Sequence, residues 1–300
     1  MSPRPTLAVL ALALNALVWG LSWWPLRQLD SSGLHPVWAT ACVFTLAAVA
    51  LFFLTPSAWQ LCRQHPSLVW LMVASGLTNV GFNWAVTTGD VVRVVLLFYL
   101  MPTWSLLLAW WLLKEPPTCG ALMRLLLALC GVLLVLKKAD SPWPLPQDGA
   151  DALALLSGFC FALTNIWLLR LQHTPASARM MAMFGGGALM ALACAGLACY
   201  VGAVLAPDLQ NIDVSAWGWV MGLSAAFLLS NFALQYGAAR LSAHTTAMVM
   251  MSEVVFASVS SMALGASAPT WREGLGGGMI VFAALLASLA QKNPHIERLP

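Results

Sequence analysis

A single carboxylate, Glu253, lies inside the apolar segment MVMMSEVVFASVSS, which covers residues 248–261. A charged side chain at the centre of a membrane-spanning helix costs roughly 3 kcal/mol on insertion scales, so such an acid is usually retained for a partner, a proton or a substrate. Three interpretations are open. Glu253 is permanently protonated and bonded to an amide such as Asn231 or Gln235, or it pairs with a buried cation, or it takes up and releases a proton.

Amide side chains recur at helical spacing in other apolar segments. Residues at positions i, i+3, i+4 and i+7 share one side of a helix, so Asn79 and Asn83 fall on one face. Asn231 and Gln235 share a face in the same way, and Asn165 lies in a third segment. Amides in hydrocarbon are costly unless they are hydrogen-bonded, so they are predicted to face a bundle interior or a wet cavity. They either line a polar pathway or join helices through hydrogen bonds of about 0.6 kcal/mol each.

Aromatic side chains lie in the same segments. Trp19 and Trp23 share a helical face with Ser22, whereas Tyr99 and Trp104 lie further along the chain. Large rings at these places form either ordinary packing surfaces or apolar walls around a flat or cationic ligand.

The composition is that of a chain embedded in a lipid bilayer. Its 300 residues are 60% hydrophobic and 8% charged, and the mean hydropathy is +0.81, whereas a soluble domain carries about 25% charged residues. The seven cysteines form no CxxC pair and the histidines do not cluster, so neither a metal site nor a disulfide framework is indicated. Phosphate-loop, nucleophile-elbow and zinc-protease motifs are also missing, which argues against an ATP-driven pump, an enzyme or a bound cofactor. The net charge of +3 gives no indication of a nucleic-acid partner.

Ten apolar windows are long enough to cross the roughly 30 Å of bilayer hydrocarbon. They run over 6–26, 36–55, 67–88, 92–113, 119–137, 151–170, 180–204, 215–236, 244–264 and 273–291. The connectors are too short for a separate soluble domain, and the longest, 137–151, divides the chain into halves at 1–140 and 141–300. With the N-terminus inside, nine of the 14 lysines and arginines fall on the cytoplasmic side and five outside. This bias predicts that both termini are cytoplasmic.

The two halves show a weak internal match at a shift of roughly 143 to 152 residues. WGLSWWPLRQL from Trp19 lies over ALTNIWLLRLQ from Ala162, and LLKEPPT lies over LGASAPT. Because each half has five spans, an odd number, the second copy enters the membrane from the opposite side. This inverted-repeat plan is typical of secondary transporters, whose substrate site lies near the midplane between the copies.

The same match pairs residues of the fourth and ninth spans. Glu253 lies over Pro102, 151 residues earlier, and a mid-span proline removes a backbone hydrogen bond and bends or frees the helix. Arg93 and His244 stand at matching span starts, where either could line a gate. Arg93 has a simpler interpretation too, because Asp90 lies three residues before it and could pair with it.

These segments resemble a known family. WGLSW in the first span, LLKEPPTCGALMRLLLALCGVLLVL after the fourth, and SEVVFASVSSMALGASAPTWREGLGGGMIVFAALL at the end are similar to the EamA-type transporters of the drug/metabolite transporter superfamily. The resemblance covers essentially the whole chain, and SEVVFASVSS is similar to the branch that includes the YddG-like amino-acid exporters. It implies inner-membrane transport of small organic solutes, commonly efflux, through a central cavity. The acid that many members carry after the ninth helix, matching Glu115, is Ala266 here.

Together these patterns predict an all-α integral membrane protein with ten transmembrane helices as two inverted five-helix repeats around a central cavity. We expect a secondary transporter in a bacterial inner membrane that exports small organic metabolites, amino acids foremost, by alternating access. A proton-coupled exporter of drugs and organic cations is the alternative. The expected partners are the solute, the lipid bilayer and, if Glu253 titrates, protons; the protein is a monomer or a homodimer. The predicted solute-binding residues are Trp19, Ser22, Trp23, Asn79, Asn83, Tyr99, Trp104, Asn165, Asn231, Gln235 and Glu253. The predicted gating or coupling residues are Arg93, Pro102, His244 and Glu253.

Overall fold

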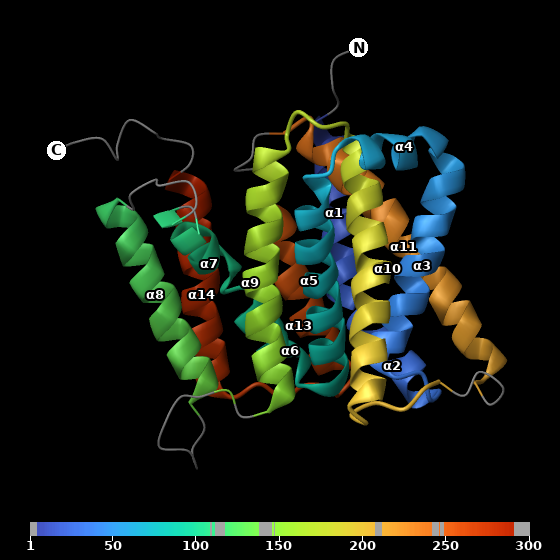
Figure 1. Ribbon diagram of the computed structural model, residues 1–300. Helices are drawn as coiled ribbons and strands as arrows, with labels where there is room; N and C mark the ends of the chain where they lie inside the picture. Colours follow the sequence, from blue (N-terminus) through green and yellow to red (C-terminus); the bar gives the residue numbers. More distant parts are fainter. Residues whose placement is uncertain are drawn as a thin grey trace.

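The computed structural model describes residues 5–108, 110–111, 118–137, 146, 148–207, 212–241, 246 and 249–290, and its regular elements within them are helices. The helices are α1 (Pro5–Leu21), α2 (Trp23–Ser31), α3 (Pro36–Leu54), α4 (Pro56–Gln64), α5 (Leu68–Thr88), α6 (Val91–Phe98), α7 (Met101–Leu108), α8 (Cys119–Leu136), α9 (Gly149–Arg170), α10 (Ala176–Tyr200), α11 (Val214–Ala238), α13 (Ser252–Ala263) and α14 (Trp271–Ala290). Most of them stand side by side, as in a membrane bundle (Figure 1).

Eight helical stretches of the described residues are long and apolar enough to cross a membrane. They correspond to the first eight predicted spans. The ninth, 244–264, is described only in part, by α13. The tenth predicted span falls on α14, which has 20 residues and is not one of those eight stretches.

Two predicted spans are interrupted. The first continues to Ser31, but α1 ends at Leu21 and α2 begins at Trp23, with the hydroxyl of Ser22 donating to the carbonyl of Trp19 at 2.7 Å. The fourth is divided at Tyr99 and Leu100 into α6 and α7. Pro102 therefore lies in the first turn of α7, where its missing N–H would have no partner within the helix. It begins a half-helix instead of bending a continuous one.

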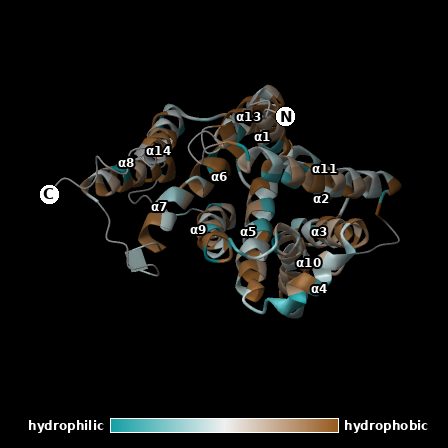
Figure 2. Cartoon of the chain, turned by 90° about the horizontal axis from the view of Figure 1, so that it is seen from above, coloured by the Kyte–Doolittle hydropathy of each residue, from teal (hydrophilic) through white to brown (hydrophobic). Residues whose placement is uncertain are grey.

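Helix α4, which joins α3 to α5, was not predicted. This helix of nine residues begins with Pro56 and carries polar residues such as Gln60 and Arg63. Viewed from above, its hydrophilic colouring contrasts with the hydrophobic colouring that prevails on the longer helices (Figure 2). Large apolar side chains also lie on the outside of the bundle, for example Phe53 at 74% exposure, as expected for a surface covered by lipid.

Helices of the two halves pack against each other throughout the bundle. In the described residues α5 contacts α9 and α10, α1 contacts α11 and α13, α3 contacts α10 and α11, α6 contacts α9 and α13, and α8 contacts α14. Helices α8 and α14 approach each other closely at Gly131 and Gly276. A Cβ added at Gly131 would lie 2.6 Å from the carbonyl oxygen of Gly276, so only glycine fits there.

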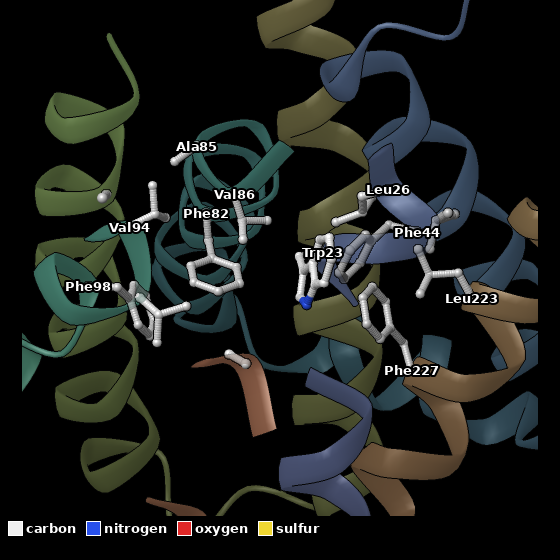
Figure 3. Packing of buried hydrophobic residues seen from close by; sticks show 14 of the residues in the cluster. Trp23, Leu26, Phe44, Phe82, Ala85, Val86, Val94, Phe98, Leu223 and Phe227 are labelled. Carbon is white, nitrogen blue, oxygen red and sulfur yellow. The ribbon is translucent and has the colours of Figure 1, made fainter. Parts of the chain in front are cut away.

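Aromatic rings fill the interior between these helices (Figure 3). Phe82 of α5 packs on Phe98 of α6 with ring centroids 4.8 Å apart. On the other side of the view, Phe44 of α3 lies 5.7 Å from Phe227 of α11. The core thus joins helices that are far apart in the sequence.

Candidate functional site

The candidate site lies where the break between α6 and α7 meets the start of α13. Tyr99 occupies the break, and Glu253 lies in the first turn of α13. The Tyr99 hydroxyl donates to Oε2 of Glu253 at 3.3 Å and lies 3.5 Å from the carbonyl oxygen of Met250. Helix α13 packs against α6, so the predicted fourth and ninth spans are neighbours.

Two glycines bring neighbouring helices close to this junction. A Cβ added at Gly20 of α1 would lie 2.9 Å from the carbonyl oxygen of Glu253. A Cβ added at Gly158 of α9 would lie 2.7 Å from the carbonyl oxygen of Phe98, the last residue of α6. Since backbone packs directly on backbone at both places, the helix ends that carry Tyr99 and Glu253 are held in position.

The partner of Glu253 is a hydroxyl and not one of the expected amides. Nε2 of Gln235 donates to Oδ1 of Asn231 at 3.0 Å, so these two amides bond to each other. In the described part of the chain, no ion pair includes Glu253. Among the acids described there, it is the only one at the middle of a predicted span. Such a carboxylate can accept a hydrogen bond, hold a proton or contact the ammonium group of a solute.

The other predicted amides are dispersed. Nδ2 of Asn79 donates to the carbonyl of Ser75 in its own helix at 2.8 Å. Nδ2 of Asn83 donates to the hydroxyl of Thr40 on α3 at 3.2 Å, and Asn83 is completely buried. Asn165 is exposed on α9.

A further buried amide, Asn15, was not among the predicted site residues. Its Nδ2 donates to the carbonyl of Ser230 on α11 at 2.8 Å. Oδ1 of Asn15 has no hydrogen-bond partner among the described residues, and the same is true of Oδ1 of Asn83. The helical face shared by Asn15 and Trp19 was the signal in the sequence.

The predicted tryptophans each contact another helix. Trp19 stacks on Phe227 of α11 with centroids 4.3 Å apart. Trp23 is 3% exposed, and its Nε1 donates to the hydroxyl of Ser260 on α13 at 3.0 Å. Trp104 lies edge-on to Phe159 of α9 at 5.6 Å. Trp23 therefore reaches the helix that carries Glu253.

Arg93 lies in a second polar cluster, at the ends of four helices. Oδ1 of Asp90 accepts from the backbone N–H of Arg93 at 2.9 Å, so the expected neighbour caps α6. The guanidinium instead forms two hydrogen bonds with Asp151 of α9, from Nε to Oδ1 at 2.7 Å and from Nη2 to Oδ2 at 2.8 Å. Its Nη1 donates to the carbonyl of Val135 and lies 3.5 Å from Oε1 of Glu273.

Asp151 and Glu273 were not predicted to be functional, because acidic residues are common in the first turn of a helix. His244, the predicted counterpart of Arg93, lies outside the described residues, as does Glu115.

Comparison with known proteins supports the class of the protein. Residues 6–137 match the model of the EamA-like transporter family. The matched residues make up less than half of the chain, and together with the apolar helices long enough to cross a membrane they suggest a membrane transporter of small solutes. The matched residues coincide closely with the first of the two expected units.

Solved structures show the fold over the whole chain. Fifteen chains of solved structures match. One of them, described as "Crystal structure of protein", is 20% identical, covers 96% of this chain and 98% of its own, and has a TM-score of 0.59. At that identity the likeness concerns the fold alone. No curated protein matches the sequence.

Proposed function

We propose that this chain is a secondary transporter that exports small organic metabolites, amino acids foremost, by alternating access across a bacterial inner membrane. The observation that carries the proposal is the half-buried acid Glu253, which lies where two helix ends from opposite halves of the chain meet. In secondary transporters, interrupted helices of this kind lie near the membrane midplane, where the solute binds. A carboxylate in the middle of a membrane span is costly and is usually functional.

The helix contacts support an arrangement as two inverted repeats, 1–140 and 141–300. In such an arrangement each span corresponds to the span five positions further along the chain, and the tenth is followed by the first. The contact of α5 with α9 then corresponds to the contact of α11 with α1. It likewise turns the contact of α5 with α10 into that of α11 with α3. Three pairs join a span directly to its own counterpart: α8 with α14, α3 with α10, and α6 with α13. This pattern is what a pseudo-twofold axis in the membrane plane would produce, with the pair of α6 and α13 close to the axis.

The roles within the site follow from these positions. Glu253 contacts the ammonium group of the solute or exchanges a proton with it, and the Tyr99 hydroxyl orients the carboxylate. Trp23, hydrogen-bonded to α13, forms part of an apolar wall. The interruption before Pro102 lets α6 and α7 move separately. Trp19 and Trp104 complete the proposed lining with the partly buried amides Asn79, Asn231 and Gln235, which provide hydrogen-bond donors and acceptors.

Counterflow into proteoliposomes tests the proposal, with a panel of amino acids, purines, sugars and organic cations. We expect exchange of at least one amino acid, and a fall of about tenfold or more in Glu253→Gln, because a hydrogen bond to a charged group is worth about 1.5–3 kcal/mol. Tyr99→Phe, which keeps the ring, is expected to lose about fivefold for a loss of about 1 kcal/mol. Tyr200→Phe, at an 89% exposed tyrosine, is the matched control and should exchange normally.

Two results would contradict this proposal. Normal exchange by Glu253→Gln with an unchanged pH profile would remove the carboxylate from the mechanism. Absence of exchange for every amino acid in the panel would remove the proposed class of solute.

A second function, proton-coupled export of organic cations, is favoured by one observation. In the described residues the polar partner of the Glu253 side chain is the Tyr99 hydroxyl, so a cationic solute would find an acid with no competing cationic side chain. Proton release from purified protein on addition of many different cations would support this function. A response to amino acids alone would exclude it.

A further inference from the structure

We propose that Arg93, Asp151 and Glu273 form a gate that holds the two halves together at one end of the molecule and parts to admit or release the solute there. We call these three residues the Arg93 gate. The inference rests on the proposed transport function, but it concerns an end of the bundle and not the junction at Glu253.

The Arg93 gate joins helix ends from both halves. Arg93 lies in the first turn of α6 and reaches the carbonyl of Val135 near the end of α8, both in the first half. Asp151 lies in the first turn of α9 and Glu273 in that of α14, both in the second half. These ends meet at the lower edge of Figure 1, which the predicted orientation places outside. The side chains of Arg93, Asp151 and Glu273 are 7%, 2% and 14% exposed.

The strength of the contact comes from the shape of the arginine. Its guanidinium forms two parallel hydrogen bonds with Asp151, at 2.7 and 2.8 Å, which is the fork geometry that makes arginine–carboxylate pairs strong. The backbone N–H of Val92 also donates to the hydroxyl of Ser267, across the halves, at 3.3 Å. Separation of the halves at this end must break both contacts.

Each member of the gate has an alternative partner in its own half, which distinguishes a reversible contact from a permanent one. Breaking a buried ion pair is costly mainly because it leaves a charge uncompensated. Arg93 has Asp90 one turn away. Oε2 of Glu273 already accepts from the backbone N–H and the hydroxyl of Thr270, at 2.7 and 3.0 Å. Asp151 lies in the first turn of α9, where the helix dipole favours an anion. Opening therefore leaves every charge with a favourable neighbour.

The first test measures opening without any solute. In a variant that lacks the seven native cysteines, Ser267→Cys reports access of a membrane-impermeant maleimide to this end. We expect Asp151→Asn to accelerate labelling by about tenfold or more, since it removes the carboxylate that forms the ion pair with Arg93. Asp148→Asn is the matched control, because Asp148 caps the same helix and asparagine caps equally well. Labelling of Asp151→Asn no faster than that of Asp148→Asn would overturn the gate.

A second variant, Arg93→Lys, tests the gate independently in case Asp151→Asn does not fold. Arg93→Lys keeps the charge but loses the fork, and we expect labelling between that of the parent and that of Asp151→Asn. Both variants should elute as monodisperse protein from a sizing column. No acceleration in folded Arg93→Lys would also count against the gate.

The second test asks whether the contact must open. Val92→Cys with Ser267→Cys should form a disulfide across the halves, and oxidation should abolish counterflow while reduction restores it. Each single cysteine variant under the same oxidant should exchange normally. Unchanged exchange by the cross-linked protein would make the contact a permanent brace. If the reduced protein exchanges no solute at all, the proposed function fails, whereas the labelling result still decides whether this end opens.

Discussion

At the scale of single residues, the contact between Asn83 and Thr40 shows how an amide is accommodated inside the bundle. Asn83 is completely buried, and Thr40 supplies the acceptor for its Nδ2 at 3.2 Å. Hydrogen bonds between membrane helices average about 0.6 kcal/mol and reach about 1.7 kcal/mol. Asn83 therefore joins α5 to α3 in this conformation, which is one of the two roles that the sequence left open.

This contact gives a prediction for stability. Thr40→Val keeps the shape of the side chain but leaves Nδ2 of Asn83 buried without an acceptor, so we expect the unfolding free energy to fall by about 1 kcal/mol. Adding Asn83→Leu removes both polar groups and should restore most of the loss. Unfolding of the purified protein in detergent measures both effects, with Thr88→Val, at an exposed threonine, as control. A double variant less stable than Thr40→Val would show that Asn83 has another essential contact.

Arg93 shows what residue-level reasoning can and cannot foresee. The spacing of Asp90 and Arg93 correctly indicated that the two residues interact at a helix start, through the backbone of Arg93. The partner of the guanidinium, Asp151, is 58 residues away, and neither helical periodicity nor charge spacing relates positions that distant. Glu253 is the opposite case, since the cost of a lone acid in an apolar segment drew attention to it without any knowledge of its partner.

At the scale of elements, hydropathy located the spans but not their interruptions. The apolar run around Tyr99 and Leu100 continues unbroken through the end of α6 and the start of α7, so a composition window reports one helix. Pro102 was a local hint, because a mid-span proline bends or frees a helix, but it did not indicate that the helix is divided at Tyr99 and Leu100. At the break Gly158 of α9 packs against the carbonyl of Phe98, a contact between distant segments that hydropathy does not report.

The approach of α8 to α14 gives a prediction at this scale. A Cβ at Gly131 would lie 2.6 Å from the carbonyl oxygen of Gly276, so Gly131→Ala must push the helices apart. We expect a loss of about 1–3 kcal/mol in unfolding free energy, as for other overpacked sites. Gly278→Ala on α14 is the matched control, since nothing lies within 4 Å of a Cβ there and alanine is the better helix former. Thermal unfolding in detergent compares the two, and equal stability would mean that α8 and α14 separate without cost.

At the scale of the whole molecule, the positions of the eight spans that the structure describes were easier to predict than the way they assemble. Five apolar windows per half follow from composition, and an odd number implies inversion by counting alone. Which helices then touch, such as α5 with α9, depends on glycine contacts and ring packing between segments far apart in the sequence. The internal match of the two halves aligned the fourth span with the ninth, and the structure brings their helices α6 and α13 into contact.

The orientation of the molecule gives the last prediction. Ser31 ends α2 and His173 follows α9, both residues are exposed, and five membrane-spanning stretches lie between them. An odd number of crossings would put Ser31 and His173 on opposite sides of the membrane, and the excess of lysine and arginine on the side of the N-terminus predicts that His173 is cytoplasmic. In variants without native cysteines, Ser31→Cys should react with an impermeant maleimide in intact cells, and His173→Cys only after permeabilisation. The reverse pattern would place both termini outside, while labelling of both positions in intact cells would contradict the five crossings on which the inverted arrangement depends.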